Sequence, residues 1–143
     1  MYKSVLVATD GSATASEAVR VATELARIFG ATLHIASVYG SVETSAMAWS
    51  GIGIHVEEDE PDQHVAAHTE AMAADARAKG VNAKTHVMPG FVVERILAIA
   101  AEQGVDLIVV GNKGMRGLKR VLGSVPNAIA HSAQCAVLIV NTT

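Results

Sequence analysis

The sequence predicts an α/β fold, a single-domain three-layer α/β/α sandwich around a five-stranded, mostly parallel sheet. Two observations lead to this fold class. Short runs rich in Val, Ile and Leu alternate along the chain with segments whose apolar residues recur every three or four positions. Aromatic residues make up only 3% of the 143 residues, so small and β-branched side chains must fill the core, as they do where helices lie close on a sheet.

Five apolar segments are predicted to be strands. The first, fourth and fifth are nearly continuous in Val, Leu and Ile, which is typical of parallel strands that helices cover on both faces. The second and third alternate more between apolar and polar residues. The predicted strands are residues 4–8, 32–38, 82–88, 106–110 and 136–140.

Four helices are predicted in the segments between and beside these strands. The apolar face of the first helix ends at Phe29, with Gly30 as its C-terminal stop, and Thr14 and Glu17 are placed to form a capping box. The others are expected at about residues 62–79, at about residues 92–102 and directly after Ser124. Right-handed crossovers then give a doubly wound, Rossmann-like sheet of strand order 3-2-1-4-5. Residues 39–61 interrupt the alternation and are interpreted as a long loop, with a solvated connector favoured over a ligand lid.

Charge and composition narrow the classes of partner. The net charge of −3 and the pI near 6.0 give no overall electrostatic reason to bind nucleic acid or an anionic membrane. Cys135 is the only cysteine, which excludes an intrachain disulfide, and the first residues lead into a strand without a signal-peptide pattern. No apolar run is long enough to span a membrane. We therefore expect a cytoplasmic protein with neither nucleic acid nor membrane as a partner.

The segment between the fourth strand and the last helix has the features of an anion site. Its glycines let backbone amides approach a ligand without a Cβ in the way. They are Gly111, Gly114, Gly117 and Gly123. The segment also holds four basic residues in a stretch of eight without an acidic one, namely Lys113, Arg116, Lys119 and Arg120. Ser124 stands at an N-cap position and Pro126 suits the first helical turn, so the helix dipole would favour an anion there. The structural alternative is that the glycines only turn the chain and the basic residues form a solvated face.

Ligands of doubly wound sheets bind beyond the carboxyl ends of the strands, where the connections diverge. Asp10 lies at such an end, because it follows the first strand and precedes a helix. It could bond ribose hydroxyls or a base, or hold magnesium near phosphates; the alternative is a role in the turn and in capping the helix.

Several other site classes are disfavoured. The sequence has neither the Gly-x-Gly-x-x-Gly of dinucleotide-binding folds after its first strand nor the Gly-x4-Gly-Lys-Ser/Thr of P-loop NTPases. His64 and His68 would share a helix face and are expected to be an exposed pair rather than metal ligands. Cys135 is expected to be a small apolar residue rather than a nucleophile. The remaining histidines show no grouping along the sequence; they are His34, His55, His86 and His131.

Several segments resemble the universal stress protein family. They are VLVATDGS at residues 5–12, ASVY at 36–39, VGNKG at 110–114, LGSVP at 122–126 and VLIV at 137–140. The resemblance covers essentially all of residues 1–143, as one universal stress protein domain. It implies ATP or a related adenine nucleotide as ligand, with Mg possible only through the ATP phosphates, and a homodimer that pairs the last strands at about residues 136–141.

The resemblance also implies which residues bind the nucleotide. Those expected at the ribose and phosphates are Gly111, Gly114, Gly123, Ser124 and Val125. Those expected around the base and ribose are Ala8, Asp10, Val38 and Val110. Their neighbours Thr9, Asn112, Lys113 and Arg116 complete the expected set.

One spacing departs from the pattern of ATP-binding members, which is Gly, two residues, Gly, nine residues, Gly, and Ser or Thr. Eight residues separate Gly114 from Gly123 here. One residue fewer in a helix shifts every later residue by about 1.5 Å and about 100°. Three functions therefore stay open: an ATP-binding regulator of the stress response with at most slow hydrolysis, a dimeric interaction module that binds no nucleotide, and a cyclic AMP-binding protein, whose single phosphate suits the shorter spacing. An enzyme acting on a small metabolite is least favoured, because no nucleophile and base can be paired.

Overall fold

The computed structural model describes residues 1–10, 13–39, 63–112 and 124–142 of the chain. Within these residues the strands are β1 (Ser4–Ala8), β2 (Thr32–Tyr39), β3 (Ala83–Pro89), β4 (Leu107–Gly111) and β5 (Ala136–Val140). The helices are α1 (Ala13–Phe29), α3 (Gln63–Ala78), α4 (Val92–Glu102) and α5 (Ser124–Ser132). The predicted strands begin and end within one residue of the observed ones, and the helix predicted at 92–102 has those bounds.

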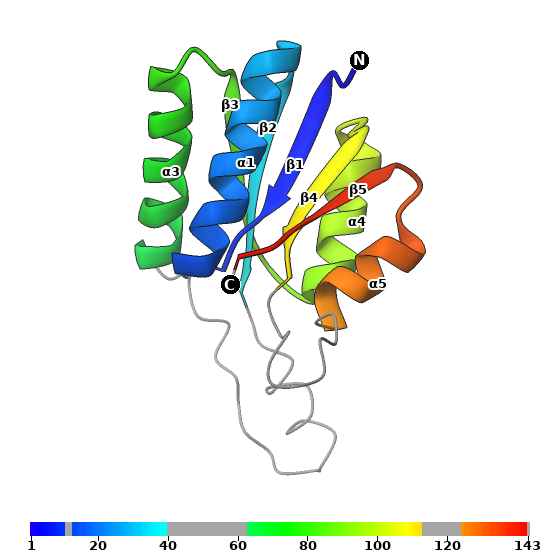
Figure 1. Cartoon of the computed structure of the whole chain (residues 1–143). Coiled ribbons are helices and arrows are strands. Elements are labelled where there is room, and N and C mark those ends of the chain that lie inside the picture. Colours follow the sequence, from blue (N-terminus) through cyan, green and yellow to red (C-terminus); the bar gives the residue numbers. More distant parts are fainter. Residues whose placement is uncertain (11–12, 40–62, 113–123, 143) are drawn as a thin grey trace.

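The strands form one sheet with the order β3-β2-β1-β4-β5, and every pair of neighbours is parallel. This confirms the predicted fold class and strand order. β1 is the central strand, with β2 and β3 on one side and β4 and β5 on the other. Helices cover both faces, α1 and α3 one of them and α4 and α5 the other, as Figure 1 shows.

Side chains of alternate strand residues point to the two faces and build two apolar clusters. Val5 and Val7 of β1 join the cluster beneath α1 and α3, whereas Leu6 joins the cluster beneath α4 and α5. The side of α1 that faces the sheet presents alanines, of which Ala18 and Ala22 are 0% exposed. Small side chains thus let this helix lie close on the strands, as the low aromatic content predicts.

The end of α1 confirms its predicted glycine stop. Gly30 has a φ of 64°, a left-handed conformation that glycine adopts without a steric penalty, and the N–H of Ala31 donates back to the carbonyl of Ala26 at 2.8 Å. The predicted capping box is wrong. The helix begins at Ala13, before Thr14, and the carboxylate of Glu17 accepts from the guanidinium of Arg20 at 2.9 and 2.6 Å.

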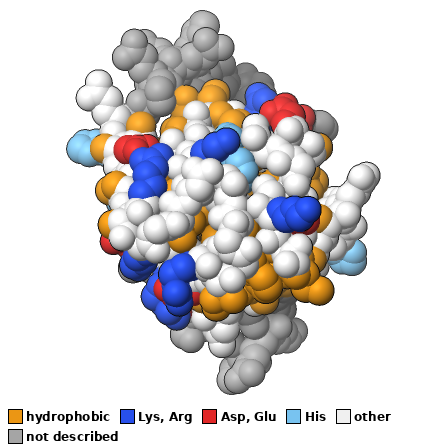
Figure 2. Space-filling model, turned by 90° about the horizontal axis from the view of Figure 1, so that it is seen from above, with side chains coloured by type: hydrophobic (Ala, Val, Ile, Leu, Met, Phe, Trp, Pro, Cys, Tyr) orange, Lys and Arg blue, Asp and Glu red, His pale blue; other side chains and the backbone are white. Residues whose placement is uncertain are grey.

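Acidic and basic side chains are interspersed at the end of the molecule opposite the carboxyl ends of the strands. Figure 2 looks onto this end, where α1 and α3 finish. Near their last turns Arg27 pairs with Glu24 at 2.9 Å and Lys79 pairs with Asp75 at 3.5 Å. None of the described helices is long and apolar enough to cross a membrane.

Candidate functional site

The carboxyl ends of β1 and β4 meet at the point where the chain connections diverge. Val7 and Val109 are register partners near the ends of these two strands. From β1 the chain continues to α1 on one face, and from β4 it continues to α5 on the other face (Figure 1). This is the topological switch point at which ligands of doubly wound sheets bind, and the sequence places the candidate residues there.

The three residues at the end of β1, Ala8, Thr9 and Asp10, differ in how much solvent reaches them. Ala8 is half-buried and packs against the cluster beneath α4 and α5. Thr9 is buried, and its N–H donates to the carbonyl of Ala36 at 2.9 Å, which extends the pairing of β1 with β2 by one residue. Asp10, two residues after the end of β1, is exposed and lies at the switch point.

A strip of half-buried apolar residues crosses the ends of three neighbouring strands. Ala8 is the last residue of β1, and Val38 and Met88 are the next-to-last residues of β2 and β3. All three lie on the face that α4 and α5 cover, and Val38 and Met88 are register partners. A flat heterocycle such as a nucleobase could lie against this strip. Met88 is absent from the set expected from the sequence. The signal for it is the alternation of its strand, which places Met88 on the same face as Val38 once the parallel register is known.

The end of β4 is more deeply buried. Val110 is 2% exposed and belongs to the core beneath α4 and α5, so that little of its side chain can touch a ligand. Gly111 packs so closely on Thr142 that a Cβ at position 111 would lie 3.2 Å from the Thr142 methyl carbon. Asn112 is 3% exposed and bonds to the residues that come after β5.

The helix predicted directly after Ser124 is present as α5, which includes Ser124 as its first residue. The helix begins at Ser124, which is exposed, Val125 is half-buried, and Pro126 lies buried in the first turn. The first amides of a helix have no intrahelical partner and carry the positive end of its dipole, so this terminus favours an anion. The other expected members of the set, Lys113, Gly114, Arg116 and Gly123, lie outside the described residues.

The structure corrects the expectation that the histidines are not grouped. His34 of β2 and His86 of β3 lie diagonally across neighbouring strands, with His34 Nδ1 2.9 Å from His86 Nε2. His34 is 3% exposed, and burial, with smaller contributions from His86 and Lys84, lowers the pKa of His34 to about 4. Burial likewise lowers the pKa of His86, partly opposed by Glu102. The pair is thus uncharged at neutral pH and shares a hydrogen bond in the sheet.

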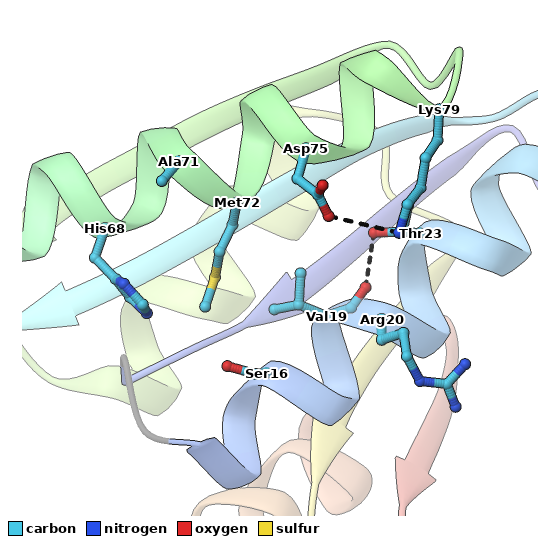
Figure 3. Close-up of a pocket in the computed structure, with 9 residues that line it drawn as sticks. All are labelled: Ser16, Val19, Arg20, Thr23, His68, Ala71, Met72, Asp75 and Lys79. Carbon is cyan, nitrogen blue, oxygen red and sulfur yellow. Dashed lines mark hydrogen bonds and ion pairs between the residues drawn. The ribbon is translucent and has the colours of Figure 1, made fainter.

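A groove lies on the other face of the sheet, between α1 and α3 (Figure 3). This groove of about 320 Å³ is lined by apolar side chains such as Val19 and Met72, and Lys79 and Asp75 pair at one end. It contains none of the residues expected to bind nucleotide. His68 lines it and is exposed, as is His64.

Cys135 behaves as an apolar residue. It packs against the cluster beneath α4 and α5, and burial raises the pKa of its thiol above the ordinary value, with a smaller contribution from Asp106. A thiol with a raised pKa is a poor nucleophile at neutral pH, so this agrees with the expected packing role.

Comparison with known proteins identifies the family. Residues 1–141 match the family model described as the universal stress protein family. Universal stress protein A homolog 1 of Coxiella burnetii is 34% identical, covering 97% of this chain and 96% of that one, and universal stress protein YxiE of Bacillus subtilis is 36% identical, covering 98% and 99%. A universal stress protein solved in complex with cAMP has 30% identity and a TM-score of 0.73, covering 99% of this chain and 98% of its own. The chain therefore belongs to the universal stress protein family.

Proposed function

We propose that this protein binds an adenine nucleotide, with ATP as the first candidate, at the carboxyl ends of β1, β2 and β4. One observation carries the proposal. The carboxyl ends of the strands carry an apolar strip for a base and the exposed residue Asp10, and the chain after β4 leads to the start of α5 with the exposed Ser124. These three features suit the base, the ribose hydroxyls and the phosphates of a nucleotide.

Cyclic AMP is the second candidate ligand. The similar protein solved with cAMP, at 30% identity over nearly the whole chain, supports it. The eight residues between Gly114 and Gly123 also favour a ligand with one phosphate, because the shorter segment departs from the ATP-binding pattern. Both candidates share the adenosine part, and they differ in how much they require of the segment that begins at Lys113.

The role that we propose is regulatory, with at most slow ATP hydrolysis and with magnesium carried by the ATP phosphates. Repeated turnover of ATP, many molecules per second, by protein free of contaminating ATPases would contradict this. A dimeric interaction module without a ligand is the alternative from a different class. It predicts that no nucleotide changes the melting temperature.

The test begins with nucleotide released from freshly purified protein by denaturation and identified by mass spectrometry. The stripped protein is then titrated calorimetrically with ATP and with cyclic AMP, and its melting temperature is measured. A ligand at about a hundred times its Kd adds about 2.7 kcal/mol of stability, which raises the melting temperature of a chain of this size by about 5 to 10 °C. If neither nucleotide is released, bound or stabilising, the proposal is wrong and the interaction module is favoured.

A matched pair of variants locates the site. Asp10→Asn removes the charge at the switch point, whereas Asp75→Asn removes a similar exposed carboxylate from α3, away from the candidate residues. We expect Asp10→Asn to weaken nucleotide binding about tenfold and Asp75→Asn to leave it unchanged. Gly114→Val, in the predicted phosphate segment, should weaken ATP more than cyclic AMP. Equal effects of the two Asp variants would place the ligand elsewhere.

We also propose that β5 mediates a homodimer. β5 is an outer strand of the sheet, and Leu138 and Ile139, which point to opposite faces, are 37% and 36% exposed. An outer strand with apolar side chains on both faces is suited to pair with a second copy. Light scattering should give twice the chain mass for the wild type, and Leu138→Glu should shift it toward the monomer.

A further inference from the structure

The amide side chain of Asn112 joins the end of β4 to the two residues directly after β5. Its Oδ1 accepts from the backbone N–H of Thr142 at 3.0 Å and from the Thr142 hydroxyl at 2.9 Å. Its Nδ2 donates to Oδ1 of Asn141 at 3.1 Å. The backbone N–H of Asn112 donates to the carbonyl of Val140 at 3.0 Å and continues the pairing of β4 with β5.

Two observations explain why this network favours its closed form. Asn112 is 3% exposed, so breaking its hydrogen bonds would leave polar atoms buried without replacement by water. Gly111 also packs against the methyl group of Thr142, with no room for a Cβ at ordinary contact distance. The last residues of β4 and the residues after β5 are therefore joined into one hydrogen-bonded unit.

This hydrogen-bonded unit lies between the outer strand β5 and the candidate nucleotide site. On one side it continues β5, whose other edge faces outward. On the other side it includes Gly111 and adjoins Val110, at the end of β4 in the candidate nucleotide site. A ligand that stabilises the end of β4 should therefore also stabilise residues 141–142 through these hydrogen bonds. A substitution at residues 141–142 should in turn destabilise the end of β4.

We infer that Asn112 is a positioning residue that couples nucleotide binding at the end of β4 to the C-terminal residues beside β5. The inference rests on the proposed function and adds a route by which the nucleotide acts on the outer strand. Asn112 acts here through Asn141 and Thr142 rather than by recognising the ligand. Because coupling free energies are reciprocal, a nucleotide that stabilises the network is bound more weakly when the network is cut from the C-terminal side.

Two substitutions at Thr142 separate the hydrogen bond from the packing. Thr142→Val keeps the shape and the methyl contact with Gly111 but removes the hydroxyl that donates to Asn112. Thr142→Ser keeps the hydroxyl and removes the methyl. Loss of one such hydrogen bond lowers the ratio of the closed to the open network about fivefold, which is the largest factor by which Thr142→Val can weaken nucleotide binding through this network; we expect a loss of about three- to fivefold. Thr142→Ser should bind within about twofold of the wild type.

The results distinguish this inference from the proposed function. If the wild type binds neither ATP nor cyclic AMP, the proposed function fails and the coupling with it. If the wild type binds but Thr142→Val binds equally well, or Thr142→Ser is weakened as much as Thr142→Val, only the coupling is wrong. Both substitutions lie beyond the last strand, and circular dichroism checks that the variants are folded.

Amide hydrogen exchange gives a second readout that a purely structural role would not move. The N–H of Thr142 donates to Asn112, so its exchange reports whether the network is closed. Saturating nucleotide should slow the exchange of this amide at least about threefold in the wild type and less in Thr142→Val. An exchange rate for Thr142 that nucleotide leaves unchanged in the wild type would overturn the coupling.

Discussion

Acidification should weaken the fold through the imidazole pair of His34 and His86, and His34→Gln should remove much of this sensitivity. Glutamine can still donate a hydrogen bond to His86 Nε2, but it does not titrate. The wild-type pair lies between β2 and β3, with His34 3% exposed and Lys84 nearby. A proton added to this pair would place a positive charge in a buried site beside another base and a lysine.

The sign and the size of the effect are set by the pKa of His34. It falls from its ordinary value of 6.5 to about 4, mainly because of burial. Because the folded state holds the proton less tightly than the unfolded chain, stability is fully present above pH 6.5 and is lost as the pH falls toward 4. One pKa unit corresponds to about 1.4 kcal/mol, so between about pH 7 and pH 4.5 His34 alone removes about 2 kcal/mol from the free energy of unfolding. His86, whose pKa burial also lowers, acts in the same direction.

Urea unfolding monitored by circular dichroism, at about pH 7 and pH 4.5 and one protein concentration, measures this loss. All titrating groups contribute to the total, so the informative quantity is the difference between proteins. His34→Gln should lose about 2 kcal/mol less than the wild type over this range, whereas His131→Gln, on the exposed end of α5, should lose as much as the wild type. Equal losses in all three proteins would refute the argument that the buried pair controls the acid sensitivity.

Two further predictions concern the backbone and the core. Gly90 has a φ of 132°, and a Cβ there would lie 2.7 Å from Arg95 Nε, so Gly90→Ala should destabilise the protein by about 1 to 3 kcal/mol. Gly80→Ala, at a φ of 84° with no atom within 4 Å of the added Cβ, carries the backbone strain alone and should destabilise less in the same urea assay. Ile96→Ala, at a fully buried position of α4, should lower the free energy of unfolding by about 2 to 5 kcal/mol, whereas Ile28→Ala, at a 66% exposed position of α1, should change it by less than about 0.5 kcal/mol.

The fold could be predicted from local patterns because each of its elements carries its own signal. β1 and β4 are buried on both faces and are nearly continuous in branched apolar residues. The glycine after α1 ends that helix because it adopts a positive φ, which is a property of one residue and its neighbours. Alternation of strands and helices with right-handed crossovers then leaves few topologies.

Contacts that depend on the pairing register of two strands could not be predicted from such local sequence patterns. His34 and His86 are 52 residues apart, and only the parallel register of β2 with β3 brings their rings together. The bonds from Asn112 to Asn141 and Thr142 likewise depend on how β4 pairs with β5. The sequence places Asn112 in a glycine-rich segment expected to bind the nucleotide, but it gives no sign that the buried amide of Asn112 also bonds to the C-terminal residues.

The two register-dependent clusters lie on opposite sides of β1, which makes their effects separable. The imidazole pair joins β2 to β3, and the Asn112 network joins β4 to the residues after β5, and the hydrogen bonds given above for the two clusters involve different residues. Free-energy changes at sites without shared partners add to within about 0.5 kcal/mol. In the double variant His34→Gln/Thr142→Val we therefore expect the reduced acid sensitivity of the first substitution and the weakened nucleotide binding of the second, each unchanged in size. Measured non-additivity above about 0.5 kcal/mol would mean that the central strand transmits strain between the two halves of the sheet, and the nucleotide site would then respond to pH through His34.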